Sequence, residues 1–227
     1  MLTGDDNHPH ARGVSWLDVI QSPMVGEPGK QFGYGPYQFL AFGEALQRIL
    51  LNTFDETYEE YMKRRIFKPL DINVAWWMRD EVNNPQIAGG MMLTSSDWAK
   101  FGELVRKQGL YNGEQLIPSE LFPLLTQGTE QNPGYGLTWW LKEPVTQQHI
   151  EAIPQLQGDM KDIMNSDWLP EDMFMAAGAG KQMLYVIPSL ELVIVRQAPA
   201  INDNQYRDIE FLSLLLKEKK NISPNED

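Results

Sequence analysis

The stretch around which the rest of the chain is arranged is PGKQFGYGP, residues 28–36. A Pro-Gly turn leads into a short aromatic run, and a Gly-Pro pair breaks the backbone just before a helical pattern. Glycine lets the backbone turn sharply, and proline fixes it. Tyr34 lies between two glycines, so we expect its hydroxyl to be presented for proton transfer. The alternative is a tight turn with a half-buried tyrosine, which these turn residues also favour.

The composition excludes several classes of partner. The 227 residues carry a net charge of -12 with a pI near 4.7, which argues against nucleic acid and anionic membranes because both require a basic face. No apolar run of about 18 residues is present, so no membrane span is predicted. Cysteine is absent, which excludes disulfides and Cys-ligated metals. His8 and His10 lie near acidic residues in a loop-like segment, a pattern that rarely makes a specific metal site. We therefore predict no metal and no cofactor.

Helical patterns dominate residues 1–133. An apolar stripe predicts a helix over residues 37–51. Thr57 and Glu60 form a capping box that begins a second helix, with Glu59–Lys63 and Glu60–Arg64 as outer ion pairs. Further predicted elements are an extended piece at residues 91–93, a helix capped by Thr94 and a short helix over residues 119–125.

Strand patterns dominate residues 134–218. Extended runs are predicted over residues 135–141, 173–177, 182–187 and 190–196, followed by a covering helix over 203–217. Residues 142–172 are polar and Pro-bearing, and we expect an irregular insertion or functional lid there. Helices first and an antiparallel sheet afterwards indicate an α+β fold.

Five blocks in order resemble the serine β-lactamase-related hydrolases. They are PGKQFGYG, YEEYMKRRIFKPLDI, AGGMMLTSSDWAKFGELVRKQG, NPGYGLTWW and GAGKQMLYVIPSLELVIVRQ. The likeness covers about residues 15–217 and is strongest to the class C-like branch, which contains esterases, D-amino-acid peptidases, amide hydrolases and penicillin-binding-protein-like enzymes of bacteria. It implies a β-lactamase/transpeptidase-like fold, here as one partial domain over residues 1–227.

The resemblance implies acyl transfer through a serine. Family members combine a Ser-x-x-Lys turn, a Tyr-x-Asn motif and an edge-strand motif that helps to form the oxyanion hole. Tyr34 matches the motif tyrosine, but Pro36 stands where the asparagine is expected. Gly178, Ala179 and Gly180 match the edge-strand motif loosely. Lys181 is either the motif lysine or, as the placement of the hairpin favours, a charge on the strand surface.

The nucleophile has no match. No serine among the 227 residues is followed three positions later by lysine; Ser96 and Ser213 precede a lysine by four. We therefore expect the N-terminal strands and the Ser-x-x-Lys segment of the family to be missing. The chain is then the C-terminal portion of a serine hydrolase, or a short relative without acyl chemistry.

Two functions follow from these patterns. The first is hydrolysis of a small ester, amide or lactam, with Trp139, Trp140 and Trp168 as a pocket wall, although core packing explains those residues equally well. The second is a non-catalytic module that binds a ligand or partner. In either case the strand over residues 190–196 would be an open edge, which predicts self-association. The family resemblance makes a periplasmic or secreted location plausible, but the sequence leaves the compartment open.

Overall fold

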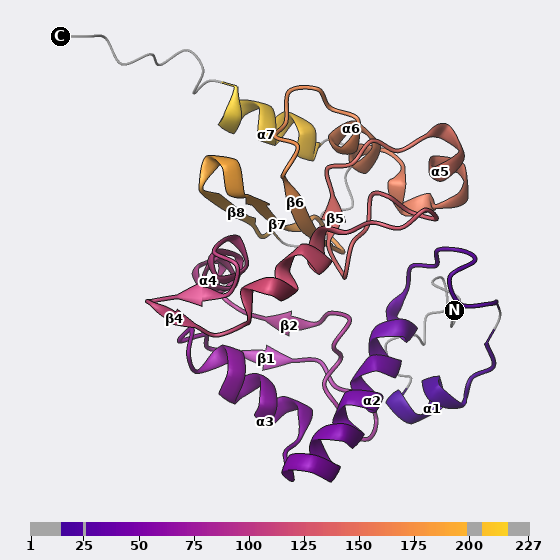
Figure 1. The fold of residues 1–227 in the computed structure, drawn as a ribbon, viewed down its shortest axis with the longest axis vertical. Coiled ribbons are helices and arrows are strands. Elements are labelled where there is room, and N and C mark those ends of the chain that lie inside the picture. Colours follow the sequence, from indigo (N-terminus) through magenta and orange to yellow (C-terminus); the bar gives the residue numbers. More distant parts are fainter. Residues whose placement is uncertain (1–14, 25, 199–205, 218–227) are drawn as a thin grey trace.

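A computed structural model describes residues 15–24, 26–198 and 206–217 of the chain (Figure 1). His8, His10 and the C-terminal tail lie outside these residues. Within the described ranges no helix is long and apolar enough to cross a membrane, and no cluster of His, Cys, Asp and Glu is arranged to hold a metal ion.

The first half of the chain folds around its own apolar core. Helix α2 (Pro36–Phe54) packs against α1 (Trp16–Gln21), and its C-terminal end leads into α3 (Tyr58–Met62) and a π-helical turn, η1 (Lys63–Phe67). Strands β1 (Trp76–Trp77) and β2 (Met91–Met92) pair in antiparallel register beside these helices. The shared core consists of Trp16, Val19, Leu40, Leu50, Tyr58, Phe67 and Trp77.

The predicted start of α3 is confirmed, and one predicted ion pair is wrong. The Thr57 side chain accepts a hydrogen bond from the Glu60 amide, and the Glu60 carboxylate accepts one from the Thr57 amide. Glu59 and Lys63 form the expected ion pair at 3.0 Å. Glu60 does not pair with Arg64, because its carboxylate is engaged in the cap and the Arg64 guanidinium binds Glu56 at 2.7 Å instead.

Helix α4 (Ser95–Arg106) connects the two halves of the molecule. Thr94 caps it by accepting a hydrogen bond from the Asp97 amide, as predicted. A small hairpin follows, formed by β3 (Leu110–Tyr111) and β4 (Glu114–Gln115), and then the 3₁₀ helix η2 (Ser119–Thr126). In Figure 1, α4 lies between the sheet and the helical half.

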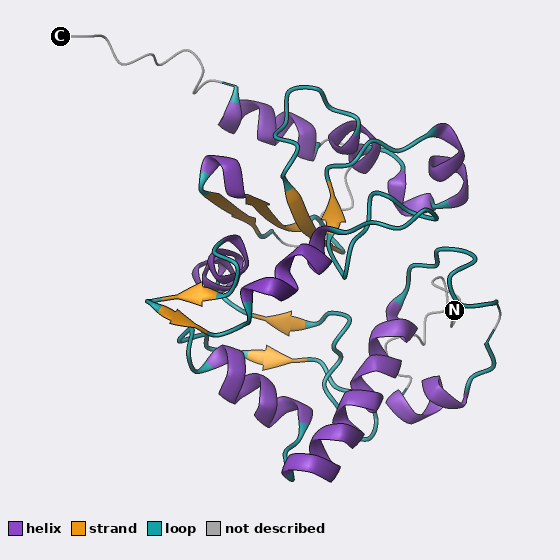
Figure 2. Cartoon of the chain, in the orientation of Figure 1, coloured by secondary structure: helices purple, strands orange, loops and turns teal. Residues whose placement is uncertain are grey.

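The second half contains a four-stranded antiparallel sheet in the order β5-β6-β7-β8 (Figure 2). The strands are β5 (Trp140–Leu141), β6 (Phe174–Gly178), β7 (Gln182–Ile187) and β8 (Leu192–Arg196). The predicted strand over 135–141 shortens to β5, with one isolated bridge between Tyr135 and Trp140. The predicted α+β class is confirmed, although this strand is shorter than expected.

Side chains alternate between the two faces of this sheet because successive strand residues point to opposite sides. One face carries Trp140, Met175, Met183, Tyr185 and Ile187. The other carries Leu141, Phe174, Leu184 and Val186 and is packed against α4 and η2.

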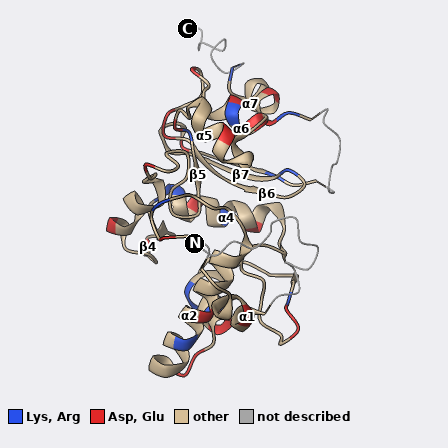
Figure 3. Cartoon of the chain, turned by 90° about the vertical axis from the view of Figure 1, so that its right-hand side faces the viewer, with Lys and Arg blue, Asp and Glu red and all other residues tan. Residues whose placement is uncertain are grey.

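The first face is covered by segments that lie on either side of β6–β8 in the sequence. They are α5 (Gln147–Ala152), η3 (Pro154–Leu156), α6 (Asp159–Met164) and the C-terminal α7 (Asp208–Leu216). Residues 142–172 therefore contain two short α-helices and a 3₁₀ turn where an irregular insertion was expected. Figure 3 shows acidic and basic residues side by side where α6 and α7 meet.

Candidate active site

Tyr34 sits on the last turn before α2. Gly29 has φ +76°, a conformation that glycine adopts without strain, and Pro36 is the first residue of the helix, where its missing N–H is tolerated. The Gln38 side-chain amide donates to the Gly33 carbonyl at 3.0 Å and so ties the turn to α2. The turn and helix start are as predicted, and Pro36 has no amide hydrogen to offer a substrate.

The Tyr34 ring is half-buried against the edge of the sheet. It meets the Tyr135 ring edge-on with centroids 5.7 Å apart, and the Trp140 ring at 5.2 Å. Tyr135 and Trp140 also pack edge-to-face, at 4.7 Å. Burial, with a smaller contribution from Tyr34, raises the pKa of Tyr135 well above its usual range. The turn therefore places Tyr34 in an aromatic cluster with Tyr135 and Trp140. The sequence patterns did not single out Tyr135 as a member of this cluster.

The glycine motif lies at the turn between β6 and β7. Gly178 is the last residue of β6 and pairs with Gln182, while Ala179 and Gly180 form the turn. Gly180 has φ +73°. Gly178 and Ala179 are exposed. Trp140, against which Tyr34 packs, pairs with Met175 on the same strand that ends in Gly178. Tyr34 thus packs against β5, the strand next to the one that ends in the glycine turn.

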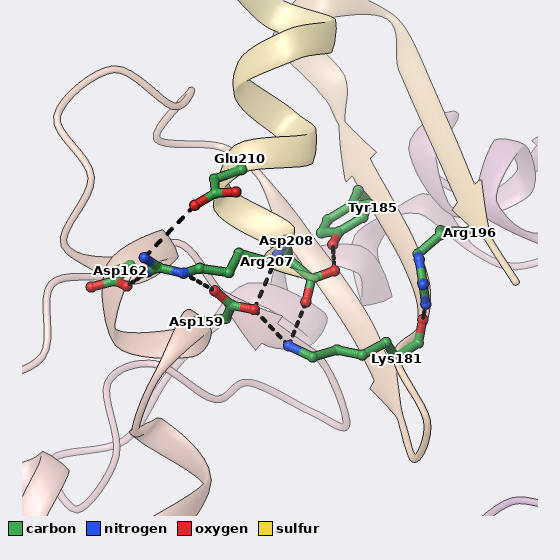
Figure 4. A network of polar contacts seen from close by, with 8 residues as sticks. All are labelled: Asp159, Asp162, Lys181, Tyr185, Arg196, Arg207, Asp208 and Glu210. Carbon is green, nitrogen blue, oxygen red and sulfur yellow. Dashed lines mark hydrogen bonds and ion pairs between the residues drawn. The ribbon is translucent and has the colours of Figure 1, made fainter. Parts of the chain in front are cut away.

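Lys181 follows the motif and is engaged in an ion-pair network (Figure 4). Its ammonium contacts Asp159 at 2.6 Å and Asp208 at 2.8 Å, so it is not a free charge on the strand surface. Tyr185 donates its hydroxyl to Asp208 at 2.7 Å, and Arg207 joins through Asp159 at 3.3 Å. The network fastens the β6–β7 turn to both α6 and the start of α7.

The charges of this network stabilise one another. Burial alone would lower the pKa of Lys181, but its hydrogen bonds to Asp159 and Asp208 outweigh that effect and raise the pKa. Burial likewise opposes ionisation of Asp159, yet the hydrogen bonds from Lys181 and from the Asp208 amide lower its pKa overall. Lys181 has φ +63°, and the Arg196 guanidinium donates to its carbonyl, so its backbone is held as well.

The three tryptophans considered for a pocket wall lie in different surroundings. Trp140 is 3% exposed and packs against Tyr34. Trp139 is 5% exposed and packs on the opposite face of the sheet, against Phe101 and Phe174. Trp168 is half-buried, and the Lys217 ammonium lies 4.3 Å from its ring centroid. Only Trp140 is placed beside Tyr34 by these contacts.

The ammonium groups of Lys100 and Lys217, the lysines that follow Ser96 and Ser213 by four residues, have other partners than those serines. Ser96 is exposed in the first turn of α4, and the Lys100 ammonium instead contacts Asp97 at 2.9 Å. The Lys217 amide donates to the Ser213 carbonyl at 3.0 Å as part of the helix end, while the Lys217 ammonium lies over the Trp168 ring.

Comparisons with known proteins found one sequence relative and several structures of similar fold. An uncharacterized protein of Alkalihalophilus pseudofirmus is 27% identical over 137 residues, which are 58% of this chain and 35% of that protein. The solved structure named "Putative 6-aminohexanoate-dimer hydrolase from Bacillus anthracis" superposes with a TM-score of 0.61 at 22% identity, over 91% of this chain and 47% of that one. A second, named "putative beta-lactamase from Bacteroides dorei DSM 17855", gives 0.56 at 15% identity, over 89% and 60%.

The chain therefore spans between about a third and three fifths of the length of these proteins. At these identities the two solved structures support the fold alone. The family assignment rests on a separate finding, the match of the Beta-lactamase family to residues 4–208, which are most of the sequence. This chain belongs to the Beta-lactamase family.

Proposed function

We propose that this chain forms part of a serine hydrolase that transfers the acyl group of a small ester, amide or lactam. The observation that carries the proposal is the position of the Tyr34 ring beside β5. The resemblance assigns Tyr34 to the family's motif tyrosine, and residues 4–208 match the Beta-lactamase family. Its ring packs against Trp140 at the edge of the sheet that holds the glycine turn. A tyrosine hydroxyl within hydrogen-bond reach of the reacting groups can act as a general acid–base catalyst.

In the proposed mechanism, a serine hydroxyl attacks the substrate carbonyl and loses its proton to a base that includes Tyr34. Backbone N–H groups in the stretch from Gly178 to Gly180 stabilise the oxyanion. The leaving group departs with a proton returned through Tyr34, and water then hydrolyses the acyl-enzyme by the same route in reverse. Because the 227 residues contain no Ser-x-x-Lys, the proposal places the nucleophile outside them.

The test compares hydrolysis of p-nitrophenyl butyrate by the complete gene product with that of its Tyr34→Phe variant. We expect the rate constant kcat to fall about a hundredfold or more, as for loss of a general acid–base group. Tyr111→Phe, a half-buried tyrosine on β3, is the matched control and should keep full activity. Turnover that Tyr34→Phe leaves unchanged would show that the tyrosine assignment is wrong.

The runner-up function is a ligand-binding relative without acyl chemistry. It is favoured by the missing Ser-x-x-Lys and by Pro36, which removes the amide of the family's asparagine. Intact-protein mass spectrometry after incubation with the ester separates the two functions. A covalent acyl adduct on a serine supports the hydrolase, whereas saturable binding with no adduct and no turnover supports the binding module.

A further inference from the structure

The turn between β6 and β7 contains a lysine in an unfavourable backbone conformation. Lys181 has φ +63°, next to Gly180 at φ +73°. Glycine adopts this left-handed region freely, whereas any other residue is strained there because its Cβ comes close to the following carbonyl oxygen. As far as the backbone is concerned, glycine would suit position 181 better. We therefore expect the lysine side chain to make contacts that compensate for this strain.

The backbone of the turn is held from the side of β8. Gln182 donates its side-chain amide to the Gly180 carbonyl at 3.2 Å and to the Ala198 carbonyl at 2.6 Å, and the Ala198 amide donates back to its side-chain oxygen at 3.1 Å. The Arg196 guanidinium donates to the Lys181 carbonyl. Because a peptide bond is planar, fixing these two carbonyls also fixes the N–H groups that follow them. The second half of the turn is thus held in one orientation.

The Lys181 side chain holds the same turn from the side of α6 and α7 (Figure 4). Its ammonium contacts Asp159 at 2.6 Å and Asp208 at 2.8 Å. Both carboxylates are fixed themselves, because Asp159 accepts a hydrogen bond from the Asp208 amide at 3.0 Å and Asp208 accepts one from the Tyr185 hydroxyl at 2.7 Å. Only 9% and 3% of the two aspartate side chains are exposed, so water has little access to replace the ammonium. Loss of the ammonium would therefore free the turn on this side.

We propose that Lys181 is a positioning residue for the oxyanion side of the proposed active site. By binding Asp159 and Asp208, its ammonium keeps the stretch from Gly178 to Gly180 in the orientation in which backbone N–H groups can stabilise an oxyanion. This role rests on the proposed function, which assigns the oxyanion to that stretch. Preorganised N–H donors stabilise developing charge only while they stay aimed at it. The two carboxylates hold the ammonium in its charged form, so Lys181 acts through the turn and not as a proton acceptor.

The first test is kinetic and uses the complete gene product with p-nitrophenyl butyrate, at a temperature where circular dichroism shows each variant fully folded. Lys181→Met removes the charge and keeps the left-handed strain. We expect kcat to fall about tenfold and KM to change less than about twofold, because the N–H donors lose their aim while the substrate contacts remain. Lys181→Gly should lose as much activity, although glycine suits the backbone. Lys181→Arg should keep most of the activity, because its guanidinium can bind both carboxylates.

The second test measures hydrogen exchange of the amides of residues 179–181. In Lys181→Met these amides should exchange about tenfold faster than in the wild type, because the turn opens more often. Lys161→Met is the matched control, since Lys161 is exposed on α6, and it should equal the wild type in both tests. A wild-type kcat in the folded Lys181→Met variant would overturn the proposal, and so would unchanged exchange rates.

The positioning role and the proposed function fail in different ways. A wild-type protein without turnover, or turnover that Tyr34→Phe leaves unchanged, contradicts the proposed hydrolase, and hydrogen exchange alone then decides whether Lys181 orders the turn. An active wild type with an equally active Lys181→Met variant contradicts the positioning role alone. If Lys181→Met does not fold, Asp159→Asn, which weakens the same ion pair, takes its place in both tests.

Discussion

At the scale of single residues, the Lys181 ammonium binds both Asp159 of α6 and Asp208 of α7. It therefore joins these two helices to the turn between β6 and β7. Lys181→Met removes it and leaves Asp208, which is 2% exposed, without its cation. We expect the free energy of unfolding to fall by about 2 kcal/mol, less than for a fully buried pair because 35% of the Lys181 side chain is exposed. Urea unfolding measures this. Lys161→Met is the control, and a loss equal to that of the control would contradict the role of the network.

The difference in the free energy of unfolding between wild type and Lys181→Met should depend on pH. The pKa of Asp159 is lowered in the folded state, so its contribution is present above its unfolded value of about 4 and is lost as the pH falls. The pKa of Lys181 is raised, so its contribution is complete below about 10.4 and is lost as the pH rises further. Unfolding measured across the range should therefore show a plateau between about pH 5 and 9 with a decline on both sides.

The surroundings of a residue can be predicted from the sequence when neighbouring residues determine them. They cannot be predicted when the contacting residues are far apart along the chain. The turn around Tyr34 is predictable because Gly29 and Pro36 dictate its backbone. The partners of Lys181 are not, because Asp159 lies 22 residues before it and Asp208 lies 27 after it. The sequence shows the lysine as a charge beside a strand. The surrounding acids appear only when α6 and α7 are packed on the sheet.

At the scale of elements, the capping residues explain why helices α3 and α4 were predicted and why α5 was missed. Thr57 and Thr94 are each followed three residues later by an acid, the usual capping pattern, and both helices were predicted. Helix α5 is capped by Thr146 with His149, whose ring replaces the usual Glu or Gln. Its pattern was therefore not recognised within residues 142–172. The strand β7 was predicted with its observed bounds, because its buried apolar run is flanked by turn residues.

The packing of α4 on the sheet depends on a glycine. A Cβ at Gly102 would lie 2.6 Å from a methyl of Val193 and 2.8 Å from one of Leu184. We expect Gly102→Leu to reduce the free energy of unfolding by about 2–3 kcal/mol, because overpacking forces the helix away from β7 and β8. Chemical denaturation measures the loss. Gly89→Ala, where an added Cβ meets nothing within 4 Å, should be close to neutral; a similar loss there would rule out close packing as the cause.

At the scale of the whole molecule, the described residues form three apolar cores. One lies in the helical half, and one lies on each face of the four-stranded sheet. The core of the helical half holds α2 in place below Tyr34, and the two faces of the sheet are covered by different segments. Tyr34 lies where the turn from the helical half reaches β5. The family resemblance singles out Tyr34, but its ring contacts with Tyr135 and Trp140 could not be predicted, since they depend on how the halves pack.

The sheet ends in β8, which within the described residues pairs only with β7. Its backbone N–H and C=O groups on the outer side are therefore available to another strand, and its Val- and Ile-rich sequence favours such pairing. We expect the 227-residue chain to self-associate through this edge as its concentration rises.

Light scattering across a concentration series measures the association, and hydrogen exchange locates it. Amides of β8 should become more protected as the oligomer forms. Amides of β7, which is already paired on both sides, are the internal control and should not change. A monodisperse monomer at all concentrations, or added protection elsewhere than β8, would show that this edge is not the site of association. Because strand pairing involves backbone groups, the association should persist at high salt, unlike contact between charged surfaces.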